Sequence, residues 1–515
     1  MSETNQKNEI RVIFDDEARA KIKKGVDIVA KAVVSTIGPK GRNVFIDNDW
    51  SPSVVNDGVT IANRISLPDK FENMGAFVVK QAASATNDGA GDGTTTTTCL
   101  LQSIVEEGFK ASENPMEIKK TLTEAADDAV TLLNEYKKDI TNTEQLVQVG
   151  TIAAENLADG QIISDVITEV GKDGVVIVEE TSQVETNYEI VHGLQIDEGF
   201  LAREMATHSD RLVAEYDDQV PVVCIIQKVT VISELRAIFE ALEEAGLKRL
   251  CLFVKEIDPI VVGILVHNQA NFRTLVVQMK EEEIEDIASI VGASIVSEKV
   301  GLNFDDFKIE NFGDAKKVIA TPKKTTIIGT QVPTSKINEL ESQRDFTKNE
   351  YEKEKITKRV GRLTGGLAVI RVGAYTEMEM RHRKLKIDDA VNATKAALKE
   401  GIVDGGGVTL YRIAQKLEPK TVGHRILKIA LETPIRQIIS NAGGNADEIL
   451  SQITEENGYD ANKGEIVNMF EAGIIDPVLV ERLSIKNAVS EGGTVITTAA
   501  AIILPDVIMT PRQHK

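Results

Sequence analysis

The chain has 515 residues and is too long for one hydrophobic core, so we expect several domains of roughly 100–200 residues each. Its formal net charge is −21 and its pI is near 4.9. Phosphate binding needs clustered Lys and Arg, so this charge disfavours a nucleic-acid partner and an anionic membrane surface. High solubility is the alternative explanation of the same charge.

The motifs of metal centres and serine hydrolases are missing. The six histidines form no HExxH pair, and the sequence contains no GxSxG. Cys99, Cys224 and Cys251 lie in apolar surroundings without CxxC spacing, which predicts buried, reduced thiols. The N-terminal segment is polar, and no apolar run is long enough to span a bilayer. We therefore expect a cytoplasmic protein without a membrane span.

The first 138 residues are predicted to be mostly helical. Over 15–37, apolar residues recur every three or four positions and stop at Gly38-Pro39, as in an amphipathic helix with a terminator. A short hairpin-like excursion is expected over 43–56. Further helical patterns cover about 70–87, 93–109 and 115–136.

The middle of the chain has a different pattern. Continuous apolar runs, typical of strands buried on both faces, occupy 221–227, 250–254 and 274–279. Helical patterns separate them at about 232–246 and 258–271. This alternation predicts a parallel βαβαβ unit. The unit carries no dinucleotide fingerprint, which argues against a metabolic ATPase with a Rossmann-like centre.

The rest of the chain returns to helical patterns. A long charged helix is expected over 335–364, a strand over 367–372 and a helix over about 376–400, with helices after Gly407 to the end. The two ends of the chain would then form one helical domain, with an α/β domain inserted between them. The protein would be a multidomain α+β protein. Glycines at the joints (Gly193, Gly365-Gly366 and Gly401) suit either hinges or tight turns.

The segment from Gly89 to Thr98, GAGDGTTTTT, leads into a predicted helix. Glycines allow close approach of an anion, and a helix N-terminus offers free N–H groups and partial positive charge. Asp92 would repel a phosphate unless a cation lies between them, so it is a candidate Mg²⁺ ligand. A Gly-rich turn with a plain N-cap is the alternative. No GxxxxGK[ST] motif is present, so this is not a Walker P-loop.

Three other turns are candidates for the same site. They are Thr36–Asn43 (TIGPKGRN), Asn56-Asp57-Gly58, and Asp404 with the three glycines that follow it. Each could equally be an ordinary turn or helix end. Their spacing along the chain does not show whether they meet.

Nine segments together resemble the motifs of GroEL-type, group I chaperonins, in the same order, from about residue 10 to 505. They are TIGPKGRNV, NDGVTIA, DKFENMGA, AGDGTTT, QVGTI, VGKDGVVIVEE, TGGLAVIRVGA, DDAVNATKAALKEGIVDGGG and AGIIDP. The resemblance implies three domains. The equatorial ATPase domain would comprise 1–138 and 401–515, the intermediate domain 139–192 and 367–400, and the apical domain 193–366.

The resemblance also implies an ATP site with Mg²⁺, and K⁺ as a further candidate ion. The implied nucleotide contacts are Thr36, Gly38, Pro39, Asp92, Gly93, Thr94, Thr95, Thr96, Gly406, Asp460 and Asp476. Asp92 would hold the metal, Asp57 would position the attacking water, and Asp389 would activate it. Asp389 would lie on a mobile intermediate-domain helix, so hydrolysis would require domain closure. Asp460 departs from the family's usual Asn, and Ala153 from its usual Ser.

By the same resemblance, non-native client proteins would bind an apical apolar surface. Its residues would be Phe200, Leu201, Met205, Phe239, Val262 and Val266. Glu204, Arg236 and His267 stand where the family is usually hydrophobic, and the segment after TLVVQM is short. These departures predict weak docking of a GroES-type co-chaperonin.

The implied assembly is a homo-oligomeric ring, heptameric in the family. The segments 110–116 and 416–426 are shorter than the family pattern, in regions that resemble contacts with an opposite ring. The implied activity is ATP hydrolysis coupled to enclosure and folding of clients. The alternative is a nucleotide-binding holdase or scaffold with the same fold but without productive cycling.

Overall fold

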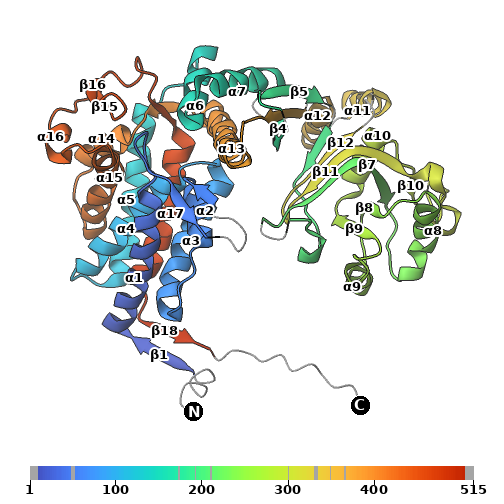
Figure 1. Cartoon of the computed structure of the whole chain (residues 1–515), viewed down its shortest axis with the longest axis horizontal. Helices are drawn as coiled ribbons and strands as arrows, with labels where there is room; N and C mark the ends of the chain where they lie inside the picture. The colour runs from blue at the N-terminus through green and yellow to red at the C-terminus, as the bar shows by residue number, and fades with distance from the viewer. Residues whose placement is uncertain are drawn as a thin grey trace. The chain divides into compact units, whose positions relative to one another are not determined.

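The computed structural model describes residues 10–47, 53–171, 174–181, 183–191, 193–208, 211–299, 301–329, 334–347, 349–364 and 367–504. The chain forms two units, each with its own hydrophobic core (Figure 1). Unit 1 comprises residues 1–168, 178–187 and 371–515, and unit 2 comprises 169–177 and 188–370. The predicted apical segment lies within unit 2. The separation of equatorial from intermediate domains stays a prediction.

Long helices that each bury an aliphatic stripe form the core of unit 1. In α1 (Asp15–Val34) the buried residues recur every three or four positions, which confirms the predicted amphipathic helix. The other core helices are α3 (Lys70–Ala90), α4 (Thr94–Lys110), α5 (Pro115–Tyr136), α14 (Val408–Lys416), α15 (Val422–Asn441) and α17 (Val478–Ile496). Because α17 packs against α3, α4 and α5, the two ends of the chain share one core.

Two glycines bring α1 and α3 unusually close together. A Cβ atom at Gly25 would lie 1.8 Å from the carbonyl oxygen of Glu72, and one at Gly75 would lie 1.9 Å from that of Ile22. Any side chain at either position would push the helices apart. This contact fixes α3, and with it the Gly-rich turn that follows Ala90.

Paired short strands interrupt the helices of unit 1. All four pairs are antiparallel: β1 (Arg11–Phe14) with β18 (Ala500–Ile503), β2 (Val44–Ile46) with β3 (Ser53–Val55), β14 (Ile402–Asp404) with β17 (Ile475–Pro477), and β15 (Gly458–Asp460) with β16 (Glu465–Val467). The β2–β3 pair confirms the predicted hairpin, although its residues 48–52 lie outside the described ranges. The expectation of helices from Gly407 to the end is wrong, because turns at Gly464 (φ 77°) and Gly473 (φ 73°) separate strands there.

Five further helices complete the helical part: α2 (Gly58–Arg64), α6 (Thr143–Ala154), α7 (Leu157–Val170), α13 (Glu377–Glu400) and α16 (Ala446–Leu450). The helix predicted over 376–400 is thereby confirmed, and α13 packs against α6 and α17. The boundaries between the two units fall in the last turn of α7 and within or beside the strands β4 (Val175–Glu180), β5 (Asn187–Val191) and β13 (Leu367–Val372).

Unit 2 is built on a seven-stranded sheet, in which β7 (Ala214–Ile225), β8 (Arg249–Val254) and β9 (Arg273–Gln278) run parallel. Between them lie α8 (Arg236–Glu244) and α9 (Pro259–His267), which confirms the predicted βαβαβ unit. The other strands are β6 (Gly193–Ile196), β10 (Ile295–Val296), β11 (Gly313–Ala320) and β12 (Thr325–Gly329). The sheet therefore mixes a parallel half with an antiparallel half.

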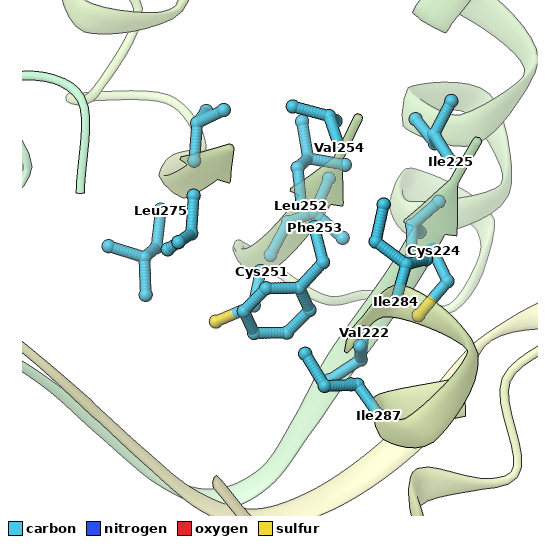
Figure 2. Packing of buried hydrophobic residues seen from close by; sticks show 14 of the residues in the cluster. Val222, Cys224, Ile225, Cys251, Leu252, Phe253, Val254, Leu275, Ile284 and Ile287 are labelled. Carbon is cyan, nitrogen blue, oxygen red and sulfur yellow. The ribbon is translucent and has the colours of Figure 1, made fainter. Parts of the chain in front are cut away.

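The core of unit 2 is mainly aliphatic. Figure 2 shows Val222, Leu252 and Phe253 of the parallel strands with Ile284 and Ile287 of α10 (Glu281–Val291). Cys224 and Cys251 are buried in this cluster, and Cys99 is buried in unit 1; all three are free thiols. This confirms the prediction of buried, reduced cysteines.

The single helix predicted over 335–364 is wrong, because two helices occupy this region: α11 (Thr334–Phe346) and α12 (Glu350–Thr364). At the end of α11, the Thr347 hydroxyl donates to the carbonyl of Gln343 at 2.7 Å. Such a bond from a β-branched residue competes with helix continuation. In α12, Arg359 forms a buried ion pair with Asp286 of α10 at 2.6 Å, which fixes the second helix against the sheet layer.

The glycine joints have local explanations where they are described. Gly193 lies in β6, where a Cβ atom would be 2.7 Å from the carbonyl of Ile327. Gly401 ends α13 with φ 84°. Gly401, at a helix end, fits the tight-turn alternative, whereas Gly193 is a closely packed residue of a strand and not part of a turn; a hinge role stays a prediction. Gly365, Gly366 and residues 505–515 lie outside the described ranges. Within those ranges, no helix combines the length and apolarity needed to cross a membrane.

Candidate active site

The start of α4 leaves its first backbone N–H groups without a side-chain cap. Gly93, the residue before the helix, has a left-handed φ of 82°. The hydroxyls of Thr97 and Thr98 are buried and donate to carbonyls one turn earlier, at 3.0 and 2.9 Å. The threonine run therefore has two roles: its last two members bond within the helix, while its first members remain at the helix end.

Asp57 and Gly58 meet this helix end. Asp57 caps α2 by accepting the N–H groups of Val59 (3.2 Å) and Thr60 (2.8 Å). A Cβ atom at Gly58 would lie 2.7 Å from the hydroxyl oxygens of both Thr94 and Thr95. The structure thus brings together two turns that the sequence could not place relative to each other.

Asp92 lies in the turn between α3 and α4. Its Oδ1 accepts the N–H of Gly93 at 2.5 Å. Burial raises the pKa of Asp92, and the charge of Asp57 raises it further, while the Gly93 N–H and the Lys386 ammonium lower it. Asp57 and Lys386 are therefore both within electrostatic range of Asp92.

Asp389 on α13 joins the same group of carboxylates. Burial is the main reason that its pKa lies well above the usual carboxyl range, and the charges of Asp92 and Asp57 are the next causes. Packing places the three carboxylates in one region, because Asn392, three residues after Asp389, packs on Gly91 next to Asp92, while Gly58, next to Asp57, packs on Thr94 and Thr95. All three belong to unit 1, so the predicted catalytic residues converge within one unit.

Side chains that the sequence analysis missed hold α13 in this position. A Cβ atom at Gly91 would lie 2.1 Å from the Cβ of Asn392, so only glycine allows the helix to approach the turn. His382 contacts the Asn56 side chain at 3.0 Å, and Lys386 pairs with Glu155 at 2.6 Å. In the sequence, only the position of Asn392, three residues after Asp389, pointed to this contact.

The Thr36–Asn43 turn is fixed by Asn441, another residue that sequence reasoning missed. The Asn441 amide donates to the carbonyls of Val34 (3.1 Å) and Ile37 (3.0 Å) at the end of α1. Gly38 has φ 81°, and Pro39 is exposed. Ile37 shares a hydrophobic cluster with Cys99 of α4 and Val408 of α14, so this turn lies beside the other site turns.

Gly406 and Asp476 are in direct contact. The Gly406 N–H donates to Asp476 Oδ2 at 3.0 Å, because β14 and β17 pair and place the glycine turn beside Asp476. Burial raises the pKa of Asp476 to about 6. These two implied nucleotide contacts are therefore adjacent.

Asp460 is buried and bonded within its own turn. Its Oδ1 accepts the N–H groups of Asn462 (2.9 Å) and Lys463 (3.1 Å), and its Oδ2 is 3.5 Å from the Lys463 ammonium. Its neighbours Tyr459 and Ala461 share the cluster that contains Val408. Asp460 is thus near the glycine turn, but its carboxylate is already satisfied.

The donor set suits Mg²⁺ only in company with a phosphate ligand. Within the described ranges, no group of three or more His, Cys, Asp or Glu side chains could hold a metal ion. Mg²⁺ often uses one or two protein carboxylates and completes its shell with water and phosphate oxygens. Asp92, beside the uncapped start of α4, can supply one such carboxylate.

The residues assigned to client binding fall into two groups in unit 2. Phe200 and Met205 are core residues, 7% and 1% exposed. Leu201 is 42% exposed, whereas Phe239, Val262 and Val266 are half-buried against the core. Ile260 of α9 is 74% exposed, but it stands about 160° from Val262 around the helix, and the sequence analysis did not select it. Glu204, Arg236 and His267 are exposed and make this surface partly polar.

Known proteins share this architecture. The model of the TCP-1/cpn60 chaperonin family matches residues 29–504. Two crystal structures of the chaperonin gp146 from bacteriophage EL (Pseudomonas aeruginosa), both in the presence of ATP-BeFx, share the fold with TM-scores of 0.66 and 0.62. Each is 18% identical and covers 96% of this chain and 99% of its own. The chain belongs to the TCP-1/cpn60 chaperonin family, which confirms both the resemblance to GroEL-type chaperonins and the multidomain α+β fold.

Proposed function

We propose that this chaperonin hydrolyses ATP with Mg²⁺ and uses the cycle to bind and enclose non-native proteins. The convergence of Asp57, Asp92 and Asp389 beside the uncapped start of α4 carries the proposal. Membership of a chaperonin family supports the chaperone role. Three buried free thiols suit the reducing cytoplasm, which is the proposed location.

The start of α4 would bind the phosphates through its free N–H groups and the hydroxyls of Thr94, Thr95 and Thr96. Thr36, Gly38 and Pro39 would form the second phosphate loop. Mg²⁺, held by Asp92, would neutralise phosphate charge when bound. K⁺ would be a further ion at the same site.

Asp389 would accept the proton of the attacking water, and Asp57 would orient that water. A carboxylate with a raised pKa is a stronger base than an exposed one, while Lys386 favours the ionised form that can accept a proton. Gly406 and Asp476 would contact the adenosine. Asp460 is a weaker candidate for the base contact because its carboxylate is satisfied locally.

Asp389→Ala tests this assignment directly. Turnover should fall by roughly two or more orders of magnitude, a usual scale for loss of a general base, while ATP binding stays nearly intact. Phosphate release and calorimetry measure the two quantities. Glu377→Gln, at the exposed start of the same helix, is the control and should keep near-wild-type turnover. Near-wild-type hydrolysis by the alanine variant would refute the role of Asp389.

Client capture is proposed for the α8–α9 face, the surface that carries Leu201, Phe239, Val262 and Val266. Exposed apolar side chains attract apolar partners, and non-native proteins offer them. Glu204, Arg236 and His267 reduce the apolar area available to a GroES-type loop. We therefore expect this chaperonin to refold a model client without GroES. Refolding yields measured with and without GroES test this, and a yield that depends strictly on GroES would contradict it.

The ring assembly, heptameric by family resemblance, would use exposed apolar side chains on short strands. Phe14 of β1 is 63% exposed, Ile502 of β18 is 53% exposed, and Phe45 of β2 is 75% exposed. Strand edges with apolar side chains suit pairing with another copy of the chain.

A single ring is the proposed working form. The two shortened segments, 110–116 and 416–426, lie side by side, because Arg425 pairs with Glu113 at 2.5 Å and the Gly423 N–H donates to Thr121 at 3.2 Å. Shortening both would remove contact area from one surface. Mass photometry tests this, and a dominant double-ring mass in every nucleotide state would rule it out.

A further inference from the structure

Glu481 is a buried acid to which the proposed mechanism gives no role. It lies in the first turn of α17, five residues after Asp476, and is 4% exposed. In the described part of the chain its Oε2 atom has no hydrogen-bond partner. An ionised carboxylate in that position would be costly, so its surroundings favour the neutral acid.

The side chain of Glu481 lies against that of Asp476, close enough for the two carboxyl groups to share a hydrogen bond. Two carboxyl groups can form such a bond only when one of them carries a proton. Burial, followed by the charges of Asp476 and Asp92, holds the pKa of Glu481 well above the usual carboxyl range. The hydrogen bonds from Gly406 and Glu481 lower the pKa of Asp476 against the larger effect of burial. The proton therefore resides on Glu481, and Asp476 accepts.

The charged groups around this pair do not neutralise it. Asp92 lies on the turn before α4, and Asp404 at the end of β14 adds a further negative charge near Asp476. The neighbouring cations have other partners: Arg412 pairs with Asp404, and Arg482 pairs with Glu400 of α13 at 2.5 Å. The proton is thus the positive charge that allows the two carboxyl groups to touch.

We propose that Glu481 is a positioning residue of the nucleotide site: its protonated carboxyl group donates to Asp476 and holds that carboxylate beside the Gly406 turn. The inference rests on the proposed nucleotide binding. Asp476 then has one bond from Glu481 and one from the Gly406 N–H, which together fix its orientation. Loss of the proton would set two adjacent negative charges against each other and displace Asp476.

Mg-ADP binding to the full-length protein, measured by calorimetry from about pH 6 to about pH 9, tests the proposal. Wild-type affinity should fall about tenfold or more on the alkaline side of the ionisation of Glu481, a change of about 1.4 kcal/mol. Glu481→Gln can donate to Asp476 but cannot lose a proton, so it should keep its neutral-pH affinity at alkaline pH. Glu481→Leu should bind weakly at every pH. Glu400→Gln, which perturbs the next residue of α17 through Arg482, should follow the wild-type profile.

The outcomes distinguish a failure of the proposed role of Glu481 from a failure of the proposed nucleotide binding. Parallel pH profiles for wild type and Glu481→Gln, with binding intact, would overturn the role of Glu481 and leave the proposed function standing. No binding by folded wild type at any pH would overturn both. If Glu481→Leu fails to fold, the comparison of wild type with Glu481→Gln still decides. The infrared carbonyl band of protonated acids is the nucleotide-free check. At neutral pH it should be weaker in Glu481→Gln than in wild type, and a part of it can remain because the pKa of Asp389 is also raised. Equal bands in the two proteins would also overturn the proposal.

Discussion

The start of α4 in unit 1 and the α8–α9 face in unit 2 were both selected from sequence as functional sites. They differ in how many of the selected residues have the position or exposure that the proposed role needs. At α4, the selected residues Asp57, Asp92, Asp389 and Thr94 gather around one helix end. In unit 2, Phe200 and Met205 turn out to be core residues, while the exposed Ile260 was not selected. Glycine and threonine at a helix start have few uses other than backbone geometry, whereas an apolar residue can serve a core or a surface equally well.

Asp92→Ala should produce the largest effect in unit 1 after loss of Asp389. Removing the carboxylate should weaken Mg-ATP binding by about 10–100-fold, on the scale of losing one charge-assisted contact of about 1.5–3 kcal/mol. Calorimetry with and without Mg²⁺ measures it. ATP affinity without Mg²⁺ should change far less. Unchanged Mg-ATP affinity would mean that Asp92 is not the metal ligand. One of the residues selected from sequence at the start of α4 would then lack its expected role.

Met205→Ser and Val262→Ser sharpen the comparison within unit 2. Met205 is fully buried, so its replacement should lower the free energy of unfolding by about 2–5 kcal/mol. Val262 is half-buried, so its replacement should cost about 1 kcal/mol or less of unfolding free energy and instead reduce co-sedimentation of an unfolded client.

Phe239→Ser should also weaken client retention without lowering basal ATPase activity. Unchanged client capture by the Phe239 and Val262 variants would place binding elsewhere.

The smallest predicted effect is a pH-dependent stability change at Glu481. Free carboxyl groups lose their protons near their ordinary pKa values, whereas the native pair keeps protons to about pH 6 at Asp476 and higher at Glu481. The native state binds more protons in that window, so its stability falls as pH rises. Glu481→Gln removes this loss and should raise Tm relative to wild type by about 2–4 °C above pH 6. A constant difference across pH, or none, would contradict the prediction.

The local pattern of the sequence was enough to predict α1, α13 and the βαβαβ unit, because each depends on periodic burial. It did not predict the break between α11 and α12 or the strands after Gly407, where single turns decide the path. Asn392 and Asn441 act through contacts with residues far along the chain, which one sequence does not display. Glu481 did have a signal: it lies three residues after Val478 and four before Ile485, on the buried stripe of α17.

Steady-state phosphate release by the wild-type protein tests the central claim most directly. The Asp389→Ala variant, purified in the same way, serves as the blank for contaminating ATPases. We expect wild-type turnover that requires Mg²⁺ and exceeds the blank by about 100-fold or more. A wild-type rate no higher than that of the variant, in protein that still binds Mg-ATP, would contradict the account and favour the nucleotide-binding holdase.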